Sequence, residues 1–399
     1  MRLSSVQIFQ QGISAILDQQ AKVQHTQQQL ATGKRVLNPS DDPAAAVQIL
    51  DITENLAQID QYNRNGGLAE GQLALEESVL GDVGNVLQRV RELIVQANNA
   101  SQSPDTRRSA ATEIAARLDE LMALANTRDA SDEFIFAGFQ SATEPFARQG
   151  DTFVYQGDDG QRMLQLSANS TVAVRDSGKD LFLTIPTGNG VFEVQAGAAN
   201  AGNTVAGTRS ATGAVTETYT LAFSQASPTD TITYQVLDSS AAVVSSGDYT
   251  AGASIAIAGA TIQFDGIPGD GDSFAISPAG KEDLFTSIQT IVDSLNAAGS
   301  APAEVAALNN QLGESLQSID NAMTHVMQVR TDVGVRMNQV ENQLNLNDSF
   351  SVQLQESLSE IQDLDLAEAI SRLNLQMVAL QAAQQTYVKV QGLSLFNYL

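Results

Sequence analysis

Residues 312–361 read LGESLQSIDNAMTHVMQVRTDVGVRMNQVENQLNLNDSFSVQLQESLSEI, with apolar side chains at alternating spacings of four and three. This seven-residue period is typical of a helix that packs along a second helix. At 1.5 Å per residue, the stretch predicts a rod of about 75 Å. Its seam, interrupted only at Arg330, Asn347 and Ser351, comprises Leu312, Leu316, Ile319, Met323, Val326, Arg330, Val333, Met337, Val340, Leu344, Asn347, Ser351, Leu354, Leu358 and Ile361.

The same period occurs at both ends of the chain, where polar residues interrupt it. The N-terminal rows are Phe9, Ile16, Val23, Leu30 and Leu37, flanked by Val6, Ile13, Gln20 and Gln27. A further seam follows Asp365, which has capping-box spacing to Glu368: Leu366, Ile370, Leu373, Met377, Leu380, Gln384 and Tyr387. Such seams poorly offset an ordering entropy of roughly 1–2 kcal/mol per residue. We therefore expect roughly the first 40 and last 35 residues to be disordered in the monomer.

Caps followed by proline predict where the other helices start. Asp42 with Pro43 predicts a helix over residues 44–99, and Ser103 with Pro104 predicts a third helix. The long pattern contains three glycines that we expect to loosen or interrupt it: Gly66, Gly67 and Gly71.

The middle of the chain changes to a period of two. Short runs that alternate apolar and polar residues, bounded by Gly, Asn, Asp or Pro, predict antiparallel strands. The runs are residues 152–155, 181–185, 191–194, 218–223, 231–236 and 261–264.

The sequence therefore predicts an α+β protein. Its N- and C-terminal segments form a long antiparallel, coiled-coil-like helical bundle, and an all-β domain of sandwich or barrel-like form is inserted. We assign residues 1–42 with 362–399 to terminal assembly segments, and residues 43–138 with 282–361 to a helical rod. Residues 139–281 form the inserted β domain.

Composition restricts the classes of partner. The formal charge of −25, from 46 acidic and 21 basic residues, disfavours nucleic acid and anionic membranes. Cysteine is absent, which excludes a disulfide framework and a thiolate zinc site. No run approaches the roughly 20 apolar residues of a membrane span. The N-terminus lacks the apolar core of a secretory signal, so an exported protein would need another route.

The sequence offers no specific catalytic, cofactor or metal motif. His25 and His325 lie inside helical patterns, where we expect packed or solvated positions. Residues 269–272 and 157–160 are acidic and glycine-rich, but they lack the ligand spacing of a calcium loop and predict turns. Carboxylates are plentiful, yet no pair points to glycoside hydrolysis. We expect no enzyme and no cofactor.

Four motifs, in order, resemble those of the bacterial flagellin superfamily. They are residues 30–44 (LATGKRVLNPSDDPA), 85–97 (NVLQRVRELIVQA), 333–341 (VGVRMNQVE) and 365–373 (DLAEAISRL). Within the superfamily, residues 133–138 (EFIFAG), 266–278 and the ending 394–399 (SLFNYL) are similar to hook-associated junction proteins. The alternatives are a filament-forming flagellin and, less favoured, a secreted adhesin or enzyme-bearing flagellin-like protein.

The resemblance implies a structural subunit between hook and filament, outside the cell and exported by the flagellar type III route without a cleaved signal. Its implied partners are other copies in a ring or helical oligomer, a larger hook-associated protein, flagellin, and a cytoplasmic export chaperone on the C-terminal helix. It also implies that the β domain faces outward. From the acidic charge and the lack of a long apolar run, we expect no nucleic acid partner and no membrane insertion. The implied assembly interface is Phe9, Ile13, Ile16, Val23, Leu30, Leu366, Ile370, Leu373, Met377, Leu380 and Tyr387. The implied turn is Gly33, Asn38, Asp41, Asp42 and Pro43, and the flagellin-like helix surface is Arg89, Arg91, Leu93 and Glu113.

Overall fold

The computed structural model describes residues 5–99, 101–150, 152–227 and 229–392. The chain divides into two compact units, Met1–Arg64 with Gln343–Leu399, and Asn65–Asn342. The helices are α1 (Ser5–Thr32), α2 (Pro43–Ala97), α3 (Pro104–Ala125), α4 (Gly178–Phe182), α5 (Leu284–Ala297), α6 (Pro302–Gln362) and α7 (Leu366–Gly392). The ending at 394–399, which we compared with hook-associated proteins, lies outside the described residues.

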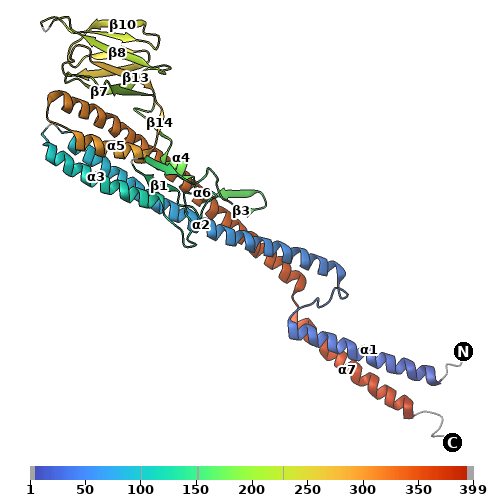
Figure 1. The fold of residues 1–399 in the computed structure, drawn as a ribbon. Helices are drawn as coiled ribbons and strands as arrows, with labels where there is room; N and C mark the ends of the chain where they lie inside the picture. Colours follow the sequence, from blue (N-terminus) through green and yellow to red (C-terminus); the bar gives the residue numbers. More distant parts are fainter. Residues whose placement is uncertain (1–4, 100, 151, 228, 393–399) are drawn as a thin grey trace. The chain divides into compact units, whose positions relative to one another are not determined.

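In the first unit, α1 and α7 lie antiparallel, side by side (Figure 1). The rings of Phe9 and Tyr387 meet edge to face, with centroids 5.5 Å apart. The turn after α1 contacts the turn before α7, because Arg35 N donates to Gln362 O at 2.7 Å and Leu364 N donates to Gly33 O at 2.9 Å. The first and last helices are therefore joined at both ends of their contact.

Two expected caps are present. α2 begins at Pro43, and the carboxylate of Asp42 accepts from Ala45 N at 3.0 Å. α3 begins at Pro104, and the hydroxyl of Ser103 accepts from Thr106 N. α2 continues unbroken through Gly66, Gly67 and Gly71, so the expected interruption there was wrong. Buried side chains on both flanks of that segment hold the helix together.

In the second unit, the long helices α2 and α6 pack together. Arg91 of α2 binds Asp320 of α6 at 2.6 Å, and Arg330 of α6 binds Glu77 of α2 at 2.5 Å. One row of the α6 seam is buried along both units: Leu312, Ile319, Val326, Val333, Val340 and Asn347. The predicted heptad frame is confirmed for this row, and the alternate row is only partly buried.

The sheets follow from the alternating segments. A five-stranded antiparallel sheet has the order β10-β9-β8-β13-β6, and a three-stranded sheet has the order β11-β12-β7. Both contribute to one core that includes Phe192, Leu221, Phe223, Ile262 and Phe274. Among the described strands there is no closed barrel, so the sandwich form is confirmed.

The strands are β1 (Phe146–Gln149), β2 (Thr152–Tyr155), β3 (Met163–Ser167), β4 (Ser170–Ala173), β5 (Ile185–Pro186), β6 (Phe192–Ala196), β7 (Val205–Ala211), β8 (Tyr219–Ser224), β9 (Thr233–Leu237), β10 (Val243–Asp248), β11 (Ser254–Ile257), β12 (Ala260–Asp265), β13 (Ser273–Pro278) and β14 (Lys281–Glu282). The ribbons β1–β2, β3–β4 and β5–β14 stand apart from the two larger sheets.

Two local predictions were wrong. The expected strand at 181–185 is not one element: its first two residues end the short helix α4, which begins because Ser177 caps Lys179 N, and Ile185 begins β5. Its apolar residues Leu181 and Phe182 are both buried, so alternation alone misled the assignment. The first helix ends at Thr32 rather than continuing to Leu37, because Gly33 adopts a φ of 68°.

Candidate assembly surface

The α1–α7 pair buries only part of the predicted interface. Val23 is buried, while the other residues of its row in α1, Phe9, Ile16 and Leu30, are partly exposed. On α7, Leu373, Leu380 and Tyr387 are likewise partly exposed. Of these residues, Phe9 and Tyr387 contact each other across the helix pair.

The expected second row of α1 faces solvent. Ile13, Gln20 and Gln27 are exposed, and the side chain of Val6 lies outside what is described. The row that approaches α7 is instead Gly12, Gln19 and Thr26, where a small residue and two polar ones meet the partner helix. The second row was therefore misassigned. Its first two residues, Val6 and Ile13, are apolar, but the row does not lie on the face of α1 that packs against α7.

Polar contacts make up much of this α1–α7 seam. Gln19 Nε2 donates to the carbonyl of Gln376 at 3.0 Å, and the hydroxyl of Thr26 donates to Gln376 Oε1 at 2.9 Å. Thr26 and Gln29 are buried. A seam with buried polar groups is specific in register but contributes less stability than an apolar one.

Many apolar side chains of the first unit are exposed. Four predicted interface residues belong to this set: Ile13 (45% exposed), Leu366, Ile370 and Met377. The others are Leu17, Val47, Leu50, Leu346, Phe350, Val352, Leu375, Val378 and Val388. Scattered exposed apolar residues are ordinary, but their number in the first unit makes this unit the candidate assembly surface.

The predicted turn between α1 and α2 is built by its two aspartates. The Asp41 carboxylate accepts from the backbone N–H groups of Leu37 and Asn38, at 3.1 and 2.9 Å. The hydrogen bond from Asn38 holds the pKa of Asp41 below its usual value. Asp41 also lies 3.2 Å from His25 Nε2, and Asp42 binds Arg35. The histidine therefore has a structural partner.

The flagellin-like helix residues divide between surface and core. Arg89 is exposed and binds Glu113 of α3 at 2.8 Å and Glu92 at 3.1 Å. Arg91 binds α6, as described above. Leu93 is 2% exposed and belongs to the core, so its assignment to the surface was wrong. Leu93 lies two positions after Arg91, and side chains two positions apart on a helix do not share a face.

A buried carboxylate that sequence reasoning missed lies on α2. Glu76 is 1% exposed, and its Oε1 accepts from Asp176 N at 2.9 Å. Burial, together with the charge of Asp176, raises the pKa of Glu76 to about 8. Arg336 of α6 binds Asp176 at 2.6 Å. The available signal was positional, because Glu76 stands in a seam row that is otherwise Ala69, Leu73, Leu80, Val83, Leu87, Val90 and Ile94.

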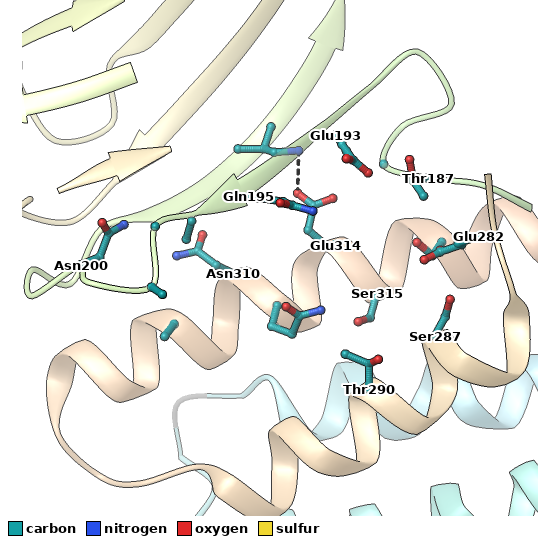
Figure 2. A pocket seen from close by; sticks show the side chains of 18 residues that line it. Thr187, Glu193, Gln195, Asn200, Glu282, Ser287, Thr290, Asn310, Glu314 and Ser315 are labelled. Atoms are coloured by element: carbon teal, nitrogen blue, oxygen red, sulfur yellow. Dashed lines mark hydrogen bonds between the residues drawn. The ribbon is translucent and has the colours of Figure 1, made fainter. Parts of the chain in front are cut away.

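Beside β6, a cavity of about 480 Å³ lies over α5 and α6 (Figure 2). Its lining is largely polar and includes Glu193, Glu282 and Glu314. Burial raises the pKa of Glu282 and of Glu314. Glu314 binds Arg209 and accepts a hydrogen bond from Val194 N, so its carboxylate already has partners within the chain.

The two acidic, glycine-rich segments are turns. Residues 269–272 and 157–160 lie between strands, and Asp272 N donates to Gly269 O, as a turn requires.

Among the residues that the structure describes, no group of three or more His, Cys, Asp or Glu side chains is placed to hold a metal ion. The described helices include none whose apolar stretch could span a membrane. His325 contacts the carbonyl oxygen of Asp180 through Nε2 at 2.9 Å.

The chain matches two family models, the bacterial flagellin N-terminal helical region over residues 5–141 and the C-terminal helical region over residues 316–399. It is 28% identical to flagellar hook-associated protein 3 of Escherichia coli K12, over 100% of this chain and 99% of that one. The crystal structure of Xanthomonas campestris FlgL is 32% identical over 77% of this chain and 99% of its own, with a TM-score of 0.72. The flagellin of Listeria monocytogenes matches only 25% of this chain, at 30% identity.

Proposed function

The chain belongs to the family of flagellar hook-associated protein 3, FlgL, and from this membership we propose that it is a structural subunit at the junction between hook and filament. The observation that carries the proposal is the share of the chain that each relative matches. Hook-associated relatives match the whole chain, sheets included, whereas flagellin matches a quarter of it. A filament-forming flagellin is therefore the second candidate.

We further propose how the subunit assembles. The exposed apolar side chains of the first unit, such as Ile370 and Met377, would be covered by other copies in a ring or helical oligomer. A larger hook-associated protein would contact it on the hook side, and flagellin on the filament side. The assembled protein would lie outside the cell, after export through the flagellar type III channel. A cytoplasmic chaperone on α7 would cover the same apolar residues before export.

Deletion of the gene tests the junction role. We expect the deleted strain to build hooks and to release flagellin into the medium, because the junction on which flagellin assembles into a filament would be missing. Normal filaments in that strain would contradict the proposal. The filament alternative makes a different prediction, since the purified protein would then polymerise alone into long filaments visible by electron microscopy.

A further inference from the structure

The two larger sheets form a body with a core of its own. We define the sheet module as residues 192–278, from the first residue of β6 to the last of β13. The buried members of its core all lie between Phe192 and Ile276. A second aromatic cluster lies outside the module, where Phe285 of α5 contacts Phe146 and Phe182 at centroid distances of 5.0 and 5.3 Å. The module therefore does not share the hydrophobic core of the helices.

Where the module meets α6, polar groups take the place of apolar packing. Asn310 accepts from Ala206 N at 2.8 Å and donates to the carbonyl of Thr204 at 2.9 Å. Glu314 accepts from Val194 N at 3.1 Å and binds Arg209 (Figure 2). These partners lie on or next to β6 and β7, which are edge strands of their sheets. The two α6 side chains thus occupy backbone groups that a further strand would otherwise take.

A third α6 residue holds the chain just before the module. Asn321 Nδ2 donates to the carbonyls of Pro186 and Gly188, each at 2.8 Å. Asn310, Glu314 and Asn321 are four and seven residues apart, so they share one face of the helix. We name these three residues the α6 latch.

The space beside the latch favours movement. The polar cavity of about 480 Å³ lies between β6 and the helices, so few apolar contacts would be lost if the two parted. Two short segments connect the module to the rest of the unit. They pair through the two-residue ladder of β5 and β14, and Thr187 N donates to Gly280 O at 3.2 Å while the Thr187 hydroxyl accepts from Gly280 N at 2.8 Å. A buried ion pair such as Arg209–Glu314 adds little net stability because both charges lose their water.

We infer that the α6 latch is releasable, and that the sheet module swings as a rigid body about residues 185–188 and 278–283 when the latch opens. The structure describes the latched state. In this state α6 fixes the position of both sheets through side-chain to backbone hydrogen bonds. Opening it exposes the β6 and β7 edges while the module core stays intact.

Spin labels on two introduced cysteines test this, since the chain has none of its own. One replaces Val244, exposed on β10, and the other replaces Thr112, exposed on α3. Double electron–electron resonance on the full chain should give one narrow distance. In N310A/E314A, the loss of buried hydrogen bonds should lower the latched-to-open ratio about a hundredfold and add a second, longer distance.

The control is Q328A, which changes an exposed residue of the same helix and should leave the distance unchanged. Near-ultraviolet circular dichroism reports whether the module remains folded. An unchanged distance distribution in a folded N310A/E314A protein overturns the inference. If the double variant unfolds, the same distance measurement on N310A alone decides, and an unchanged distribution in folded N310A overturns the inference. Unfolding of the module in both variants also overturns it, because the latch would then be needed for the module's fold and not only for its position.

Discussion

At the scale of single residues, the informative positions are those where a polar group stands in an apolar row. Glu76 and Asn347 both occupy buried seam positions, and each is held by polar contacts. Buried polar groups of this kind fix register at some cost in stability. The sequence marks Asn347 as a break in the α6 heptad pattern, whereas the buried position of Glu76 was not predicted.

Glu76 should make stability depend on pH. Its pKa rises from 4.5 to about 8 on folding, so the folded protein binds more protons than the unfolded protein between these values. The free energy of unfolding should therefore fall by more than about 1 kcal/mol as pH rises from 5 to 8. Urea unfolding of E76Q should lack most of this fall.

The neighbouring variant E77Q is the matched control, because Glu77 is partly exposed and binds Arg330. It should keep the pH dependence of the parent. If the free energy of unfolding fell equally with pH in the parent and in E76Q, Glu76 would not be the source of the pH dependence.

At the scale of elements, helices were predicted better than strands. The seven-residue period and the Asp–Pro and Ser–Pro caps found α1, α2, α3, α6 and α7, because periodicity over many residues averages out local exceptions. Ribbons such as β3–β4 were missed because four or five residues give too little alternation to detect. Which row of α1 is buried depends on how α7 packs against it. This packing cannot be predicted from the residues of one α1 row alone.

Core and surface positions of α6 should respond differently to the same change. Val333 is fully buried and Val335 is 60% exposed on the same helix. Val333→Ala should lower the free energy of unfolding by about 2 kcal/mol, from lost burial and a residual cavity. Val335→Ala should change it by less than about 0.5 kcal/mol. Thermal denaturation measures both, and equal effects would contradict the packing of this row.

The α7 seam should be needed for assembly and not for the sheets. Leu380→Asp places a charge on the partly buried face of α7, so we expect loss of motility with an unchanged sheet module. Asn374→Asp adds the same charge at an exposed position of α7 and should leave motility intact. A motile Leu380→Asp strain would count against an interface role for this residue.

At the scale of the whole molecule, the sequence predicted the class of fold and the insertion of sheets between helices. It could not predict the contacts of Asn310 and Glu314 with the sheet module, or of Asn321 with the segment before the module, because each joins residues more than a hundred positions apart. The exposed apolar residues were only partly predicted. Seam spacing identified Ile13, Leu366, Ile370 and Met377, and it assigned no role to Phe350 or Val352.

Hydrogen exchange on the free monomer should separate the parts of the chain. We expect fast exchange in residues 1–42 and 362–399, because the polar α1–α7 seam buries few apolar side chains. The α2 and α6 amides around Leu87 and Val326 should be strongly protected, since both side chains are buried. Strong protection at Ile16 or Leu380 in the monomer would contradict this expectation.

The turn after α1 and the turn before α7 lie beside each other, joined by the hydrogen bonds from Arg35 and Leu364. The break between α1 and α2 and the break between α6 and α7 therefore lie at the same level (Figure 1). Bending at this level stretches no hydrogen bond inside a helix, whereas bending anywhere along α2 or α6 would. The mechanical compliance of the helices is therefore concentrated in this cross-section, and the uninterrupted helices on either side are stiffer.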